Sequence, residues 1–509
     1  MMHLVVLPVL VPFAAAILQL ALYQAGTGTA RGISLASAAC CALLAVLLLQ
    51  ATAEAGPSAV AIGNWPAPFG IVLVADRLAA TMLAVTAAVA LPALLAATDG
   101  TDRAGLHFHP FFQLLLAGLN GAFLTGDLFN LFVFFEVLLI ASYALLVHGA
   151  GPARARAGVH YVVLNLAGSL LFLFALGLLY GTLGTLNLAD MAGRLPLLPE
   201  ADAAPARAAF ALLMAVFAFK AALLPLGFWL PHAYGAATAP VAAMFAVLTK
   251  VGIYGMLRVS GTALDGTAFT ADLVAPWLMP VGLATVVVAT LGVLAAARLG
   301  TMVAHLLLLS TGMLAAAIAT GGPAMLAAML YYLPHTTLVS AALFLLVGRI
   351  AQARGEVGDA IAHGPRLRHP VRLGAAWLLL AVAVTGLPPL SGFLGKLMLL
   401  TAAPAGPAGT AMWIIFIVSG FVGALVMARA ASTVFWERSD LPACPPLPTR
   451  PAAAAALALA IGLVPLLVLG AAPLSAHARA TAEQVAGRRA YLDAVFPPGA
   501  APVPRERRP

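Results

Sequence analysis

The sequence predicts an all-α polytopic membrane protein, and three observations lead to this fold class. Apolar residues make up 63% of the 509 residues and charged residues only 9%, which excludes a soluble domain of ordinary composition. The apolar residues form long uninterrupted runs, whereas a membrane β-barrel would show alternating segments of about ten residues. A bilayer core about 30 Å thick takes roughly 20 residues of helix per crossing, so the chain has room for some 14 transmembrane helices.

Fourteen apolar runs follow one another along the chain. In the first half they lie at about 4–23, 32–51, 71–97, 109–125, 128–148, 157–182, 207–225 and 239–260. In the second half they lie at about 275–297, 300–320, 324–348, 373–400, 411–436 and 451–470. The first run has no basic segment before it and no clear cleavage site, so we expect a membrane span rather than a removed signal. We expect a single transmembrane domain over 1–470 and a polar C-terminal tail over 471–509.

Proline interrupts two of these runs. The seventh run meets Pro225 and continues through Phe-Trp-Leu-Pro at 228–231, and the twelfth contains Gly-Leu-Pro-Pro-Leu-Ser-Gly at 386–392. At membrane depth such a break survives only inside protein or beside a water-filled cavity. Broken helices in corresponding positions of two halves are typical of transporters built from inverted repeats. Because helices 7 and 12 lie five spans apart, we expect two inverted five-helix repeats, at about 109–260 and 275–436.

The distribution of arginine predicts the orientation in a cell (inner) membrane. Twelve arginines between Arg31 and Arg450 occupy six alternate loops, whereas the opposite set of short loops holds only Arg194 and Arg207. Basic residues gather in cytoplasmic loops, so both termini are expected outside. The arginines of the C-terminal tail argue against this orientation. We assign the orientation from the twelve loop arginines, because they are the larger set.

Lysine and arginine are used differently in this chain. There are 23 arginines and three lysines, and Lys220, Lys250 and Lys396 all lie inside apolar runs, whereas nearly every arginine lies in a loop or near the end of a run. A buried lysine can lose its proton near neutral pH, but arginine stays charged in proteins. A lysine in a span can also snorkel to the interface or pair with an acid. Lys250, in the middle of its run, is least able to reach an interface.

Glu136 stands alone among apolar residues at the centre of the fifth run. A carboxylate in hydrocarbon is costly unless it is paired or protonated, so its natural partner is a lysine on a neighbouring span. Asp127, nine residues earlier, is expected to cap the start of the same helix.

Three histidines are weaker candidates for proton transfer, because a lone histidine in a helix is more often a packing residue. His335 is favoured by its mid-run position and by nearby polar side chains, which are Tyr331, Tyr332, Thr336 and Ser340. His305 has fewer polar neighbours, and His232 either helps proton uptake or lies at the interface. The three cysteines, Cys40, Cys41 and Cys444, give neither a disulfide framework nor a metal spacing. We expect no cofactor, no metal and no nucleic-acid partner.

Four ordered stretches carry a family resemblance. They are Gly-Ala-Phe-Leu-Thr-Gly-Asp-Leu-Phe-Asn at 121–130 with Phe-Phe-Glu at 134–136, Phe-Lys-Ala-Ala at 219–222 with the break that follows, the stretch from Ala239 to Gly252, and Gly-Leu-Pro-Pro at 386–389 with Lys396. Together they resemble the D subunit of the Mrp (also Mnh or Pha) multisubunit monovalent cation/proton antiporters. This family is similar in fold to the antiporter-like subunits of respiratory complex I and of membrane-bound hydrogenases.

The resemblance implies a subunit that moves protons along a polar axis at mid-membrane. Glu136 and Lys220 would form a modulating ion pair, Lys250 would be the central proton carrier, and Lys396 the terminal carrier, with His335 between the two. It also implies partner antiporter subunits and exchange of H+ for Na+ or K+. The chain departs from the family at Thr336 and Ser340, where many relatives have a histidine and then a lysine, so we expect His335 and water to bridge Lys250 and Lys396.

Two other functions stay open at this stage. The first is a proton-pumping subunit of a complex I-type or hydrogenase redox complex, with the same fold and axis. The second is a scaffold subunit that conducts no protons. An enzyme is not expected, because no nucleophile with its base and no metal-ligand spacing occurs in any run.

Overall fold

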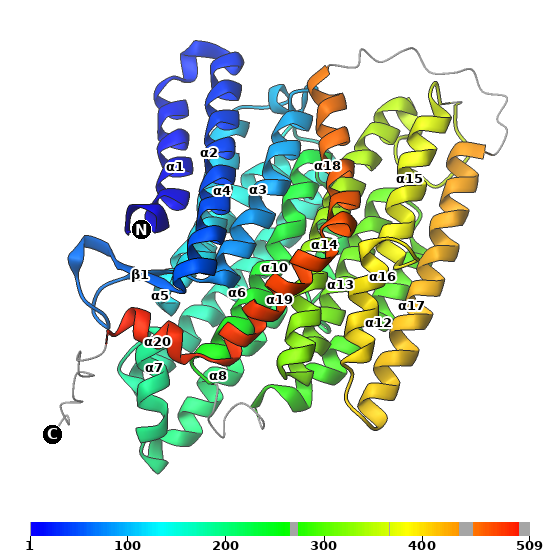
Figure 1. Cartoon of the computed structure of the whole chain (residues 1–509). Helices are drawn as coiled ribbons and strands as arrows, with labels where there is room; N and C mark the ends of the chain where they lie inside the picture. Colours follow the sequence, from blue (N-terminus) through cyan, green and yellow to red (C-terminus); the bar gives the residue numbers. More distant parts are fainter. Residues whose placement is uncertain (1, 265–272, 366, 437–450, 498–509) are drawn as a thin grey trace.

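The chain forms a bundle of long helices that stand side by side, as a computed structural model shows (Figure 1). The structure describes residues 2–264, 273–365, 367–436 and 451–497. Twelve of the described helices are long and apolar enough to cross a membrane, and shorter apolar helices occupy 108–124, 370–385 and 391–401. An apolar helix therefore lies in each predicted run, and the predicted fold class is confirmed. The count of fourteen spans and the inverted repeats stay predictions.

The helices and strands have the following bounds. The first half contains α1 (Met2–Ala21), α2 (Gly26–Ala55), β1 (Ser58–Ala61), β2 (Val72–Ala75), α3 (Arg77–Ala97), α4 (Phe108–Leu124), α5 (Leu128–Val147), α6 (Pro152–Leu183), α7 (Leu188–Arg194), α8 (Glu200–Lys220), α9 (Trp229–Ala236) and α10 (Ala239–Thr262). The second half contains α12 (Ala275–Ala295), α13 (Leu299–Thr320), α14 (Pro323–Ala353), α15 (Pro370–Thr385), α16 (Ser391–Thr401), α17 (Pro407–Ala431), α18 (Pro451–Leu469), α19 (Ala471–Ala486) and α20 (Arg489–Val495).

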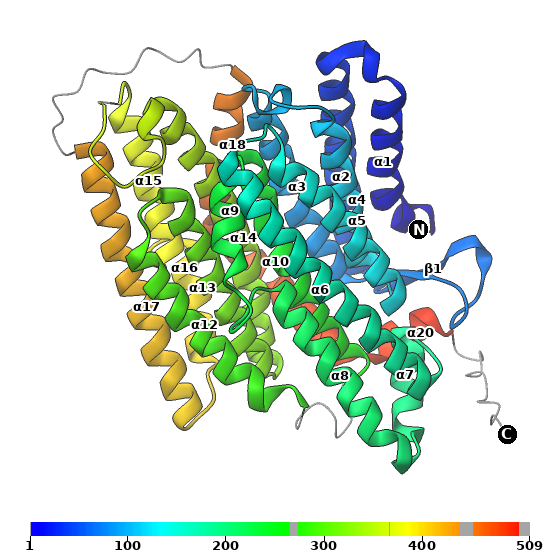
Figure 2. The same ribbon diagram turned by 180° about the vertical axis from the view of Figure 1, so that it is seen from behind.

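Three helices form the interior of the bundle. The apolar part of α10 is completely buried, and that of α13 and of α14 is nearly so, whereas α17 and α18 expose most of theirs. Views from the two sides show α10 and α14 between outer helices such as α6 and α17 (Figures 1 and 2). Polar side chains on α10 and α14 are therefore shielded from lipid.

The run predicted at 71–97 begins as a strand, which corrects the expected span. β2 pairs antiparallel with β1, and α3 begins only at Arg77. Alternating valines favour an extended backbone, and Asp76 then caps α3 by accepting a hydrogen bond from the amide of Ala79. Asp127 caps α5 in the same way, through the amide of Asn130, as predicted.

Both predicted helix breaks are present. α8 ends at Lys220 and α9 begins at Trp229, whereas α15 ends at Thr385 and α16 begins at Ser391. A helix that ends inside the bundle leaves its last carbonyl groups without helical partners, so these groups can accept hydrogen bonds from side chains.

The segment after residue 470 is not a polar tail over its described length, because α19 lies across α14 and α20 lies against the strand β1 (Figure 1). Ala478, Ala482 and Val485 form the buried face of α19 and recur every three to four residues. Residues 498–509 of the predicted tail lie outside the described residues. So do Arg366, Arg438 and Arg450, which contributed to the predicted orientation.

Candidate functional site

The five predicted site residues all lie on helices of the bundle. Glu136 is in α5, Lys220 ends α8, Lys250 is in the middle of α10, His335 is in α14 and Lys396 is in α16. The three lysines and the histidine are each at most 8% exposed. Snorkelling to an interface therefore does not account for the lysines.

The ammonium group of Lys220 is held by α6 rather than by Glu136. Its Nζ lies 3.3 Å from the backbone oxygen of Asn165, 3.5 Å from Oδ1 of the same residue and 3.3 Å from Oγ of Ser169. Glu136 is near enough to interact electrostatically with Lys220. The expected ion pair is nevertheless open, because the described residues contain no N–O distance of 4.0 Å or less between the two, and Oε1 of Glu136 is buried without a hydrogen-bond partner.

Asn165 and Ser169 were not predicted as site residues. They are spaced four residues apart, so they lie on one face of α6, and both are buried. A pair of polar residues at this spacing in an otherwise apolar run is the signal that could have identified them. The rings of Phe135 and Phe219 complete the surroundings, with centroids 6.0 and 5.7 Å from Nζ of Lys220.

Lys250 is completely buried, and among the described residues it has one polar contact, since its Nζ donates to Oγ of Ser310 over 3.3 Å. The Ser310 hydroxyl in turn donates to the backbone oxygen of Leu307. A single hydroxyl uses one of the three donors that an ammonium group offers. No carboxylate forms an ion pair with Lys250 in the described part of the chain, so a fixed positive charge here would lack a counter-ion.

The break between α15 and α16 positions Lys396. Its Nζ donates to the backbone oxygen of Thr385 over 2.6 Å and lies 3.4 Å from that of Val384. These carbonyl groups end α15, where the negative end of the helix dipole also attracts a cation. The broken helix therefore supplies the site with acceptors that an intact helix would use internally.

His335 meets the same break from α14. Its Nδ1 lies 2.8 Å from Oγ of Ser391, the first residue of α16, and Lys396 is near enough to act on it electrostatically. The structure thus brings His335 and Lys396 together, as it does Glu136 and Lys220. Lys250 has no direct hydrogen bond to either pair among the described residues, so a hydrogen-bonded connection between Lys250 and either pair would require intervening water.

Gly392 allows α14, α15 and α16 to approach at this point. A Cβ on Gly392 would lie 2.0 Å from the backbone oxygen of Ala383 and 2.8 Å from Nε2 of His335, so α16 would have to move. Misplacement of a reacting group by about 1 Å can cost about a hundredfold in rate, and we expect a loss of this order in ion transport by Gly392→Ala, measured in membrane vesicles at equal expression. Gly177→Ala is the matched control, since a Cβ there meets nothing within 4 Å. Unchanged transport by Gly392→Ala would show that the His335 geometry is not critical.

The other two histidines lie outside these contacts. His232 is exposed, and its Nδ1 lies 3.2 Å from the backbone oxygen of Phe228, the residue that precedes α9. His305 packs against Gly292, and its buried Nδ1 has no hydrogen-bond partner among the residues that the structure describes. Neither contacts the five axis residues through a hydrogen bond in the described part of the chain.

Residues 125–425 match the family described as NADH:quinone oxidoreductase/Mrp antiporter, TM. The chain is 39% identical to the D subunit of a probable K(+)/H(+) antiporter of Rhizobium meliloti over 95% of both chains. It is 36% identical to the D subunit of a Na(+)/H(+) antiporter of Bacillus subtilis, over 78% of this chain and 80% of the relative. Among solved structures, it is similar to a chain of the Mrp complex from Dietzia sp. DQ12-45-1b, with a TM-score of 0.85, 27% identity and coverage of 97% of this chain and 100% of that one.

Proposed function

The chain belongs to the NADH:quinone oxidoreductase/Mrp antiporter family of membrane subunits, and we propose that it carries protons as the D subunit of a multisubunit Na+(K+)/H+ antiporter. It is a transporter subunit that works with other antiporter subunits in a membrane complex. The observation that carries the assignment of the axis is the burial of all three lysines, with Lys250 lacking a counter-ion in the described part of the chain. No chemical conversion of a substrate is part of this function.

In the proposed mechanism, the position of the Lys220 ammonium group sets the field along the axis. When it binds Asn165 and Ser169, Glu136 is uncompensated; when it moves to Glu136, the two charges cancel. At an effective dielectric constant of about 20, charges about 6 to 10 Å apart interact by roughly 2 to 3 kcal/mol, which shifts a proton-transfer equilibrium by about tenfold to a hundredfold. Such a change is enough to drive a proton between Lys250 and the His335–Lys396 pair.

A second function shares this axis, because the family description also covers NADH:quinone oxidoreductase. In a redox complex the same residues would pump protons instead of exchanging them for a cation. The genes beside this one separate the two functions: small antiporter subunits support antiport, and dehydrogenase or hydrogenase subunits support a redox pump.

The whole operon should be expressed in a strain that lacks its own antiporters, and proton flux should be followed in inverted membrane vesicles. We expect addition of Na+ or K+ to release protons from energised vesicles. Vesicles without any Na+- or K+-linked proton flux would remove the antiport assignment.

His335 is expected to connect the two halves of the axis. His335→Ala should reduce antiport severely, because the group that accepts protons next to Lys396 is lost, whereas Ser340→Lys should be tolerated, since it restores a residue type that many relatives have near this point. Within the described residues, the buried hydroxyl of Ser340 has no hydrogen-bond partner to lose. Antiport in vesicles is the measurement, and wild-type turnover by His335→Ala would show that protons take another route.

A further inference from the structure

Buried polar side chains outside the proton axis gather between α1, α2 and α4. Along α4, His109, Gln113 and Asn120 are spaced by four and seven residues, so they lie on one face, and each is at most 3% exposed. Asn120 donates to the backbone oxygen of Pro8 in α1, and Gln113 donates to that of Ser34 in α2. At about 1.5 Å per residue, this polar face extends about 16 Å along α4.

Asp102, buried in the loop before α4, joins one end of this face to α2. The two carboxylate oxygens accept from Arg31 over 2.6 and 2.9 Å, and Nε2 of His109 lies 3.2 Å from Oδ2. Burial alone would raise the pKa of Asp102, but the hydrogen bonds with Arg31 and His109 lower it to about 2, so the carboxylate is ionised. Arg31 is one of the loop arginines that predict the cytoplasmic side, and the α1–α2 and α3–α4 connections lie at the same end of the bundle (Figure 1).

The hydrogen bonds around His109 are those of a neutral imidazole. An ionised carboxylate only accepts, so Nε2 carries a proton and donates it to Asp102. Nδ1 lies 3.0 Å from Oγ of Ser34, which also accepts from Nε2 of Gln19 over 2.7 Å. The same Gln19 nitrogen donates to the backbone oxygen of Ala30, which assigns the orientation of the amide. The Ser34 hydroxyl therefore accepts from Gln19 and donates to Nδ1.

A second proton on His109 would rearrange this network. Nδ1 would then donate toward Oγ of Ser34, and the hydroxyl proton of Ser34 would need another acceptor. Oε1 of Gln19 is buried and has no hydrogen-bond partner among the described residues, so it is an acceptor that the protonated form can use. Gln19 or Ser34 must rotate to bring the two groups together, and this changes the contacts of α4 with α1 and α2.

α4 can transmit such a change to Glu136, because α4 and α5 pack closely at the level of this residue. A Cβ on Gly118 would lie 2.8 Å from the backbone nitrogen of Leu138, and one on Gly121 would lie 2.2 Å from the ring of Phe134. Phe134 and Leu138 lie on one face of α5, and Glu136, midway between them, lies on the opposite face. Since closely packed helices transmit strain, a shift of α4 moves the backbone that positions Glu136.

The other charged and titratable groups near His109 do not take part in this rearrangement. Besides Asp102 and Arg31, they are His148, Arg154, Arg103 and His107. Nε2 of His148 donates to the backbone oxygen of Thr101 over 2.9 Å, and Arg154 donates to the backbone oxygen of His148. Arg103 and His107 are exposed. His109 is therefore the titratable residue through which pH acts on the contacts with α1 and α2.

We propose that His109 is a proton-binding site outside the transport axis, and that its protonation from the cytoplasmic side moves α4 against α5 and slows antiport. The proposal rests on the proposed antiport function and adds a regulation to it. An exchanger that carries protons inward acidifies the cytoplasm, so a site that slows it at low cytoplasmic pH limits this acidification.

The test is the pH dependence of antiport in inverted vesicles, in which the cytoplasmic face meets the outer solution. Wild-type antiport should fall as this solution is brought from about pH 8 to about pH 6, where histidine titrates. His109→Gln should stay active at low pH, because an amide can donate to Asp102 and accept from Ser34 but binds no proton there. Its ratio of antiport at high to low pH should be about tenfold smaller than that of the wild type, the change in protonated fraction that one group gives per pH unit.

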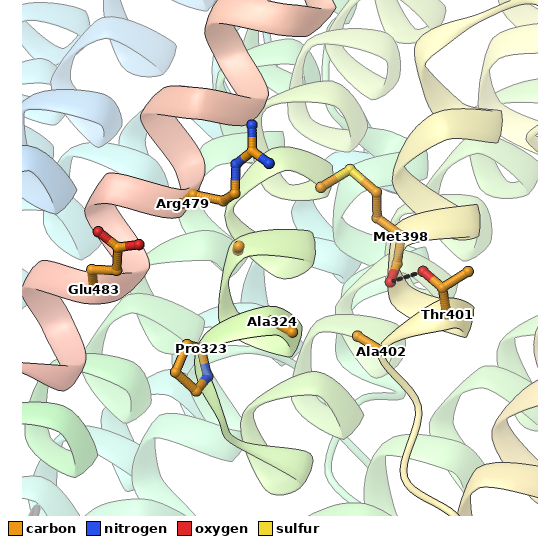
Figure 3. A pocket seen from close by; sticks show the side chains of 8 residues that line it. Pro323, Ala324, Met398, Thr401, Ala402, Arg479 and Glu483 are labelled. Carbon is orange, nitrogen blue, oxygen red and sulfur yellow. Dashed lines mark hydrogen bonds between the residues drawn. The ribbon is translucent and has the colours of Figure 1, made fainter.

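The matched control is His148→Gln, the same substitution at the neighbouring histidine, and it should leave the wild-type pH ratio unchanged. Asp102→Asn is a second test, since it removes the charge that stabilises protonated His109, so the fall in antiport should begin about one pH unit lower. Its control is Glu483→Gln, which also removes one carboxylate. Glu483 is exposed beside a cavity of about 320 Å³ between α14, α16 and α19 (Figure 3), so no buried hydrogen bond is lost.

Three results would overturn the proposal. They are an unchanged pH ratio in assembled His109→Gln, a loss of antiport by the same factor at every pH, and failure of both His109→Gln and Asp102→Asn to assemble, which would show that the network serves the fold alone. Measured beside an inactive Lys250→Ala, each of these results leaves the proposed function intact. Wild-type antiport by Lys250→Ala would instead remove the proposed function.

Discussion

Lys250→Arg is expected to abolish antiport as completely as Lys250→Ala. The side chain at this position must lose its proton in each cycle if it is a carrier, and a guanidinium group stays charged at any working pH. Charge alone is not expected to rescue transport, because Lys250 has no ion-pair partner among the described residues that Arg could retain. Proton flux should be measured in vesicles at equal expression and over about two pH units, so that a shifted optimum is not mistaken for inactivity.

The same helix provides a contrast that makes this test specific. Arg258, two turns after Lys250 on α10, forms a buried bidentate ion pair with Asp76, with distances of 2.6 and 2.8 Å. Arg258→Lys loses one of these contacts, so it should lower the amount of assembled protein rather than the flux per complex. Lys250→Arg should instead lower the flux per complex and leave the amount of assembled protein unchanged. Retained antiport by Lys250→Arg would mean that Lys250 is a fixed charge, and Lys220 and Lys396 would be the remaining carriers.

The residue types on the axis were predictable from the sequence, whereas their contacts were not. A lysine or glutamate in the middle of an apolar run is conspicuous because its burial is costly, and prolines mark the broken helices directly. Membrane helices, however, are apolar on all sides, so hydrophobic periodicity does not say which face of α6 meets α8. The hydrogen bonds of Lys220 to Asn165 and Ser169 depend on that packing, and the same is true of the contact between Lys396 and Thr385.

The two structural corrections have similar causes. Only Asp76 and Arg77 separate the apolar residues of the strand β2 from those of the helix α3, and a hydropathy average over a long window does not separate the two elements. In α19 three of the four buried residues are alanine or threonine, so the periodic hydrophobic signal is weak beside the charged residues around it. Composition therefore identified the segment as polar, although the spacing of Ala478, Ala482 and Val485 is that of a helix packed on one side.

Glu136→Ala is expected to abolish antiport while the complex still assembles. The ammonium group of Lys220 already has acceptors on α6, so the fold does not require the carboxylate, but the proposed movement of Lys220 does. Glu136→Asp should keep partial activity, because the charge is retained and one methylene of reach is lost. Flux in vesicles at equal expression is the measurement, and Glu54→Ala, at an exposed carboxylate on α2, is the matched control.

Ser169→Ala tests the other end of the same movement, because it removes a hydroxyl that lies 3.3 Å from Nζ of Lys220, whereas Asn165→Ala would keep the backbone oxygen that lies equally near. We expect Ser169→Ala to reduce antiport by stabilising Lys220 at Glu136. The two residues then act on one equilibrium, so Ser169→Ala combined with the partly active Glu136→Asp should lose less antiport than the product of the two single losses, which departs from additivity. Independent losses that multiply in the double variant would show that Ser169 supports packing rather than the position of Lys220. Full activity of Glu136→Ala would exclude any modulating role of the carboxylate. If the ammonium group of Lys220 alternates between α6 and Glu136, Glu136→Ala should lose antiport and the double variant should depart from additivity.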